Sequence, residues 1–203
     1  MILDSNTGKN RKVFKLSSID LTSAQKTSLI GFHAFTGNDY NSAFFRKAKP
    51  TCWKLMEKKQ KFVDTFCNLG VADYPSQRVL DELEEYTSLL YGVKCKEVNE
   101  ARYTIFERKL SKDKKITDMS VLPPCHQTLD LHIRRANFIA KEWRSAHISN
   151  SESTSSRENG WNEQMEPKWF EIAMPDDVEE LFTNEDFADE DFSECSDMSD
   201  DEN

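Results

Sequence analysis

The chain has 203 residues, of which 37% are hydrophobic and 31% are charged, so it is long enough for one domain with a modest core and a very polar surface. It has no run of about 18 apolar residues, the length that a membrane helix requires, and the start MILDSNTGKNRK lacks the apolar core of a signal peptide. The five cysteines are odd in number and widely spaced, which favours reduced thiols over a disulfide framework. We therefore expect an intracellular protein, nuclear or cytoplasmic, with no membrane partner.

The formal net charge of −9 conceals an uneven distribution. Residues 171–203 contain 15 Asp and Glu residues and no Lys or Arg, whereas residues 1–170 contain 27 basic and 21 acidic residues. The sequence therefore predicts a basic body followed by an acidic tail. We expect residues 183–203 to be disordered, and to serve either as a site for a protein partner or as a solubilising, charge-masking tail.

The N-terminal part offers little regular structure. Residues 1–10 are expected to be disordered, and residues 12–16 alternate polar and apolar side chains, as one short strand does. A lone strand needs a partner. We expect that partner near residues 161–172, or in a polypeptide other than this one.

Helix signals dominate the rest of the body. The capping-box spacing of Thr22 and Gln25 predicts a helix that ends near Phe35, because Gly37 can take the left-handed conformation that closes a helix. Apolar periodicity and the positions of Pro and Gly predict further helices over residues 50–57, 61–68, 79–90, 98–110 and 123–146, with a solvated loop at 112–115.

These elements predict a mainly α fold: one helical domain over residues 11–146 with a helix–hairpin–helix-like segment and at most a minor β element. A Ser-rich linker is expected at residues 147–160, followed by a docking segment at 161–182 that begins with Trp161. The acidic tail follows this segment.

The segment 44–61 is the candidate nucleic-acid-binding region. Helix N-termini and lysines both attract phosphate, and exposed aromatic side chains stack on bases. Alternatively, the lysines form a solvated face and the aromatic residues Phe44, Phe45 and Trp53 belong to the core. The only acidic residue of the segment is Glu57. Its basic residues are Arg46, Lys47, Lys49, Lys54, Lys58, Lys59 and Lys61.

The segment GFHAFTGNDYNSAFFRKAKPTCWKLMEK resembles the part of flap-endonuclease-like (PIN-like) nucleases in which a helix ends in Gly-x-Asp-Tyr and a helix–hairpin–helix follows. The resemblance implies that Gly37, Asp39 and Tyr40 match this motif, that Asp39 helps to bind catalytic Mg²⁺, and that the hairpin grips duplex DNA. Residues 11–182 also resemble a large family of uncharacterised animal proteins associated with mobile elements, through GFHAFTGNDY, CWKL, VNEARY, LPPC and RANFIAKEWRSA.

Two departures from the nuclease pattern shape the functional prediction. The hairpin run from Arg46 to Lys49 contains no glycine, so lysine charge would have to replace a close backbone grip on phosphate. A two-metal centre needs several converging carboxylates, yet only Asp4 and Asp20 precede Asp39. We therefore expect a nucleic-acid-binding, catalytically incomplete relic of such a nuclease, in which Asp39 caps its own turn.

Two alternatives remain open. The chain is either a metal-dependent nuclease that is completed by an N-terminal part or another chain, or a protein-interaction adaptor that works through its acidic tail. Arg134 and Arg135 either contact phosphate or form salt bridges on a helix face. Cys125, His126 and His132 lack zinc-finger spacing, and His132 lies on the apolar stripe of its helix, which favours a core histidine over a zinc ligand.

Overall fold

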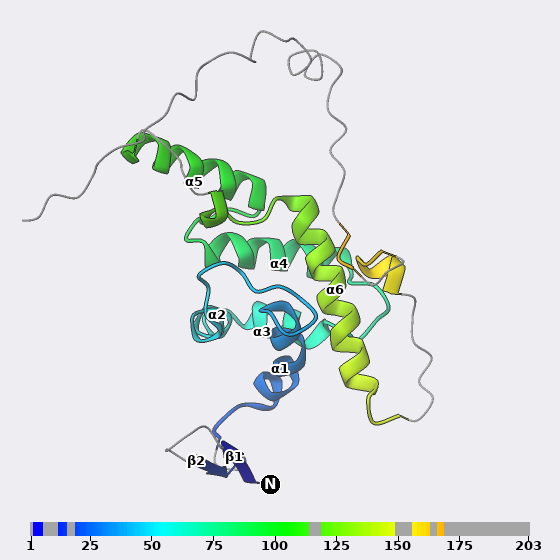
Figure 1. Cartoon of the computed structure of the whole chain (residues 1–203). Helices are drawn as coiled ribbons and strands as arrows, with labels where there is room; N and C mark the ends of the chain where they lie inside the picture. Colours follow the sequence, from blue (N-terminus) through cyan, green and yellow to red (C-terminus); the bar gives the residue numbers. More distant parts are fainter. Residues whose placement is uncertain are drawn as a thin grey trace, which may run out of the picture. The chain divides into compact units, whose positions relative to one another are not determined.

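The computed structural model describes residues 2–5, 12–15, 19–113, 119–148, 156–162 and 166–168, all within a compact unit, Met1–Trp169. The acidic tail and most of the predicted docking segment lie outside these residues. The described part is mainly helical, which confirms the predicted fold class (Figure 1). Its helices are α1 (Ser23–Phe35), α2 (Lys49–Glu57), α3 (Gln60–Asn68), α4 (Gln77–Leu90), α5 (Val98–Asp113) and α6 (His126–Ser145), with 3₁₀ turns η2 (Met119–Val121) and η3 (Ser156–Asn159).

The minor β element is a two-stranded antiparallel pair. The predicted strand is present as β2 (Lys12–Lys15), but its partner is β1 (Ile2–Ser5), with Ile2 opposite Lys15. Both expected locations of the partner, residues 161–172 and another polypeptide, are therefore wrong, and residues 2–5 of the segment expected to be disordered form a strand. The pairing is local, because β1 and β2 are close together in the sequence.

Local signals placed α1 correctly. The Thr22 side chain accepts a hydrogen bond from the Gln25 amide at 3.2 Å, and the Gln25 side chain accepts one from the Thr22 amide at 2.9 Å. This reciprocal pair satisfies two amides that would otherwise lack partners at the helix start. Gly37, with φ of 106°, turns the chain after the helix, and an added Cβ would collide with Ala43.

An aromatic core surrounds the end of α1. Phe35 is fully buried, and its ring lies 5.1 Å from that of Phe44, 5.7 Å from Phe66 and 5.2 Å from His132. Since α1 packs on both α3 and α6, this cluster joins helices that are distant in sequence. Burial of rings in such tilted and edge-on contacts is a major source of stability in a small domain.

Three boundaries differ from those predicted. Helix α5 continues through Asp113, so part of the expected loop at 112–115 is helical, and α6 begins at His126 rather than at the preceding prolines. In the predicted linker, η3 is ordered and Asn159 is buried. Trp161 is also buried, with its ring 5.2 Å from that of Phe138 in α6, so docking of this part of the chain extends the folded body beyond residue 146.

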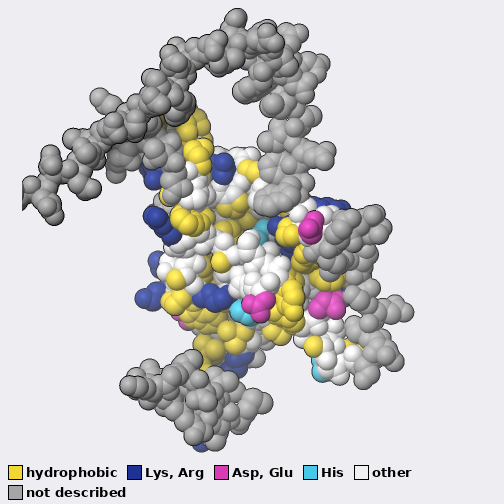
Figure 2. Space-filling model, viewed as in Figure 1, with side chains coloured by type: hydrophobic (Ala, Val, Ile, Leu, Met, Phe, Trp, Pro, Cys, Tyr) yellow, Lys and Arg dark blue, Asp and Glu magenta, His cyan; other side chains and the backbone are white. Residues whose placement is uncertain are grey.

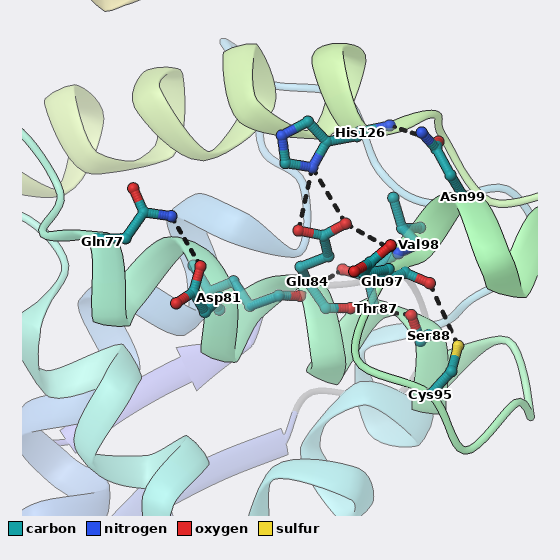
Figure 3. A network of polar contacts seen from close by, with 11 residues as sticks. Gln77, Asp81, Glu84, Thr87, Ser88, Cys95, Glu97, Val98, Asn99 and His126 are labelled. Carbon is teal, nitrogen blue, oxygen red and sulfur yellow. Dashed lines mark hydrogen bonds and ion pairs between the residues drawn. The ribbon is translucent and has the colours of Figure 1, made fainter.

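A partly buried carboxylate, that of Glu84, links α4, α5 and α6. Glu84 of α4 accepts a hydrogen bond from the Val98 amide at the start of α5 and lies 3.1 Å from Nδ1 of His126 at the start of α6 (Figure 3). The His126 amide in turn donates to Asn99. One acidic side chain therefore serves the N-termini of two helices, where a negative charge is favourable. Among the described residues, no helix has the length and apolar character that crossing a membrane requires.

Candidate nucleic-acid interface

Four lysines from two distant parts of the chain surround one cavity. Lys58 and Lys59 follow α2, whereas Lys94 and Lys96 belong to the loop between α4 and α5. The cavity has a volume of about 640 Å³ and an apolar floor that includes Leu55. We call it the basic groove. Lys and Arg side chains gather at the left-hand edge of the view, where α2 lies (Figure 2).

The loop between α4 and α5 is shaped to present its lysines outward. Gly92, with φ of 85°, reverses the chain after α4, and its amide donates to the carbonyl of Leu89. Val93 is then buried, so the next side chain in this extended run, Lys94, is exposed. Lys96 is exposed as well. No pattern in the sequence points to these two lysines, because only the folded structure brings them to Lys58.

One carboxylate partly neutralises the groove. Glu85 of α4 pairs with Lys59 at 3.1 Å and also with Lys61. Partial burial of Glu85 opposes its ionisation, but hydrogen bonds from Lys61 and Lys59 outweigh that effect and hold its pKa below the usual value. The ion pairs position the lysines, and the phosphate of a ligand would compete with Glu85 for them.

The hairpin between α1 and α2 contributes further basic side chains. Arg46 takes the left-handed conformation, with φ of 56°, at the position where a hairpin glycine would suit the backbone. Its guanidinium lies 4.9 Å from the centre of the Phe45 ring, and the Lys47 ammonium lies 4.5 Å from the centre of the Tyr91 ring. Lys54 is exposed on the outer side of α2. These residues continue the positive surface along α2.

Lys49 is turned inward and is part of the fold. Its ammonium donates to Oγ1 of Thr36 at 3.0 Å and to the carbonyl of Gly37 at 2.5 Å. Burial lowers the pKa of Lys49. The side chain thus caps the carboxyl end of α1, where a positive charge is favourable, and it contributes little to an outer binding surface.

The aromatic candidates for base stacking divide between core and surface. Phe44 is buried beside Phe35, and Trp53 is half-buried, with its ring 5.2 Å from that of Phe32. Phe45 is 43% exposed, so its ring is accessible. The core interpretation therefore holds for Phe44 and Trp53, whereas Phe45 stays a candidate for stacking.

Asp39 is exposed in the turn after α1. The turn is capped by Asn38, whose side chain accepts from the Tyr40 amide at 2.8 Å and donates to the Ala34 carbonyl at 3.1 Å. The predicted cap is therefore made by the preceding residue, and the Asp39 carboxylate faces outward beside His33. Partial burial and nearby Lys49 lower the pKa of His33, while Asp39 acts to raise it.

The described residues hold no cluster of three or more His, Cys, Asp and Glu side chains that is suited to a metal ion. His132 is buried, and its Nε2–H donates to the Phe35 carbonyl at 2.8 Å. His132 is therefore a buried histidine whose hydrogen bond is satisfied, as predicted from its place on the apolar stripe. Cys125 lies at the N-cap of α6, where its thiol contacts the Thr128 hydroxyl at 3.2 Å. Of the two arginines left open by the sequence, Arg134 pairs with Asp130 on the same helix and Arg135 is buried.

Comparison with known proteins adds no relative: no family model, curated protein or solved structure matches the chain. The resemblance to flap-endonuclease-like nucleases, based on Gly37, Asp39 and Tyr40, stays a prediction. The site is therefore interpreted from its own geometry and charge.

Proposed function

We propose that this chain binds the phosphate backbone of nucleic acid through the basic groove, as a catalytically incomplete relic of a flap-endonuclease-like protein from a mobile element. The observation that carries this proposal is the convergence of Lys58, Lys59, Lys94 and Lys96 on one cavity. Phosphate contacts of this kind release counterions, and this release dominates non-specific affinity.

The groove is suited to the sugar-phosphate backbone of a nucleic acid rather than to the edges of its bases. Its basic groups are lysines, which act as point charges and carry no planar pattern of donors for reading a base. Arg46 and Lys54 extend the charge along α2 and its preceding hairpin. We therefore expect affinity for duplex DNA that depends strongly on salt and weakly on sequence.

The test is fluorescence anisotropy with a labelled flap duplex between about 50 and 200 mM salt. The variant Lys58→Glu/Lys94→Glu should bind more weakly, and the slope of log affinity against log salt should fall by about 2, since each lost phosphate contact removes about 0.9. The matched control, Arg108→Glu/Lys109→Glu, makes the same charge change farther along α5. Equal losses in both variants would show that only net charge matters and would refute a specific groove.

A second candidate function is a metal-dependent nuclease. It is favoured by one observation: Asp39 and Glu142 of α6 line the same cavity. These carboxylates would bind Mg²⁺, which would activate water for phosphodiester cleavage, and other ligands would come from another segment or chain. Product analysis on a gel with Mg²⁺ tests this function, because cleavage should be lost in Asp39→Ala. Absence of DNA binding even at low salt would instead leave the protein-interaction adaptor.

A further inference from the structure

A second cavity of about 610 Å³ has walls of a different chemistry from those of the basic groove. It lies between α6 and the turn that follows α1, and none of the lysines and arginines that the structure describes lines it. Its walls combine aromatic rings with two carboxylates. The residues that define this aromatic cavity are Asp39, Tyr40, Phe138, Glu142, Trp143 and Trp161.

Three separate segments hold the walls in place. Phe138 and Glu142 lie four residues apart on α6 and so share one face of the helix. The turn that carries Tyr40 is fixed by its buried neighbour Asn41, whose side chain donates to the Ala34 carbonyl at 3.2 Å. Trp161 is 5% exposed and forms a backbone bridge to Pro167. The cavity is therefore formed before any ligand arrives.

Two rings of the cavity lie at an angle to each other: those of Phe138 and Trp161 meet at 64° with centres 5.2 Å apart. The ring of Trp143 stacks on that of His33, with centres 5.3 Å apart and an interplanar angle of 20°. Tyr40 is 69% exposed and Asp39 is exposed as well, so both side chains are accessible from solvent. Aromatic faces carry negative potential, and the carboxylates add to it, so the site favours a cation.

We propose that the aromatic cavity binds the methylated lysine side chain of a protein partner. Methylation leaves the charge in place but weakens hydration, so transfer of this cation into an aromatic site costs less than transfer of an ordinary ammonium, which is strongly hydrated. Its near-spherical head suits rings at an angle, whereas a planar guanidinium stacks flat on a single ring. The long apolar stem can lie along Phe138 and Ile139, which also line the cavity.

The test uses the full-length chain and four short peptides that differ at one position: trimethyllysine, lysine, arginine and an uncharged tert-butyl analogue of trimethyllysine. Binding is followed by tryptophan fluorescence and by the indole N–H resonances of Trp143 and Trp161. The trimethyllysine peptide should bind about tenfold or more tightly than each of the others, because only it combines charge with weak hydration and spherical shape. Equal binding of the uncharged analogue or of the arginine peptide would overturn the proposal, as would absence of a saturable response.

Surface variants test the assignment of the site without disturbing the core. Asp39→Asn and Tyr40→Ala change exposed residues and should each weaken binding of the trimethyllysine peptide severalfold. Asp20→Asn, which removes the same charge beyond the opposite end of α1, should leave it unchanged. Lys58→Glu/Lys94→Glu should also retain peptide binding, which separates this proposal from binding in the basic groove. Equal effects of Asp20→Asn and Asp39→Asn would refute the assignment.

Discussion

Nε of Arg135 in α6 donates to Oδ1 of Asn41 at 3.4 Å, and both side chains are buried. Nη1 of the same guanidinium donates to the carbonyl of Gly160 at 3.0 Å. The Asn41 side chain continues the network to the Ala34 carbonyl at the end of α1. One arginine thus joins the exposed Asp39 turn, the long helix and the segment that carries Trp161.

Replacement of Arg135 by methionine should lower the free energy of unfolding by about 3 kcal/mol, because it leaves a buried amide oxygen and a buried carbonyl without their donor. Urea denaturation followed by far-UV circular dichroism measures this change. Binding of the trimethyllysine peptide should weaken as well, since the cavity walls lose their common anchor.

The matched control is Arg134→Met on the same helix. Arg134 is partly exposed and pairs with Asp130 one turn away, so its loss should cost only about 0.5 kcal/mol. Similar costs for the two substitutions would show that the buried network contributes no more than a surface ion pair.

Stability should fall in mild acid because of His132. Burial lowers the pKa of His132 from 6.5 to about 4, and the positive charge of Arg135 acts in the same direction. The unfolded chain therefore binds more protons than the folded one below pH 6.5, and the free energy of unfolding decreases as the pH falls from 6.5 towards 4. The expected loss is about 2 kcal/mol at pH 5 relative to pH 8.

Urea titrations at several pH values measure this effect. His132→Gln keeps a donor for the Phe35 carbonyl but cannot titrate, so most of the pH dependence between 6.5 and 4 should disappear. His33, whose pKa is also lowered, provides the control, and His33→Gln should remove a smaller part. An unchanged pH profile in His132→Gln would contradict the assignment.

Gly70→Ala should destabilise the fold by about 3 kcal/mol. Gly70 has φ of 75°, and an added Cβ would lie 2.7 Å from Cβ of Ala140 and against the α6 backbone, so strain and a clash combine. Gly92 has φ of 85° but nothing within 4 Å of the added atom, so Gly92→Ala should cost only about 1 kcal/mol. Thermal unfolding of the pair measures the difference, and equal costs would rule out tight packing of Gly70 on α6.

Deletion of residues 183–203 should strengthen DNA binding at low salt. This segment carries ten acidic residues and no basic one, so we expect its charge to compete with phosphate for the lysines of the basic groove. Anisotropy at matched salt compares the deletion with a full-length chain whose tail acids are changed to Asn and Gln. Both should bind more tightly than the parent, and unchanged affinity in both would refute competition by the tail.

The sequence predicted the elements whose signals are local. Thr22 and Gln25 bracket the start of α1, and Gly37 lies where the chain turns after it, so the helix bounds follow from a few neighbouring residues. The stripe that includes Val79 and Leu83 likewise located α4 and its buried face. Such signals do not depend on how the chain folds back on itself.

The features that the sequence did not predict depend on contacts between distant residues. An arginine is expected on the surface of its helix because of its charge, and only the approach of Asn41 and Gly160 explains the burial of Arg135. The sequence does not distinguish the inward-turned Lys49 from its exposed basic neighbours, because its hydrogen bond to the Gly37 carbonyl exists only in the folded chain. The aromatic cavity was also not foreseen, since its walls come from three separate segments.

The hydroxyl of Tyr86 in α4 donates to the carbonyl of Cys52 at 2.7 Å, and Cys52 and Met56 of α2 are fully buried. Helix α2 is therefore held from its inner side, while Lys54 and Lys58 lie on its outer side. The outer charges can thus be exchanged one by one without disturbing the contacts that hold the helix in position.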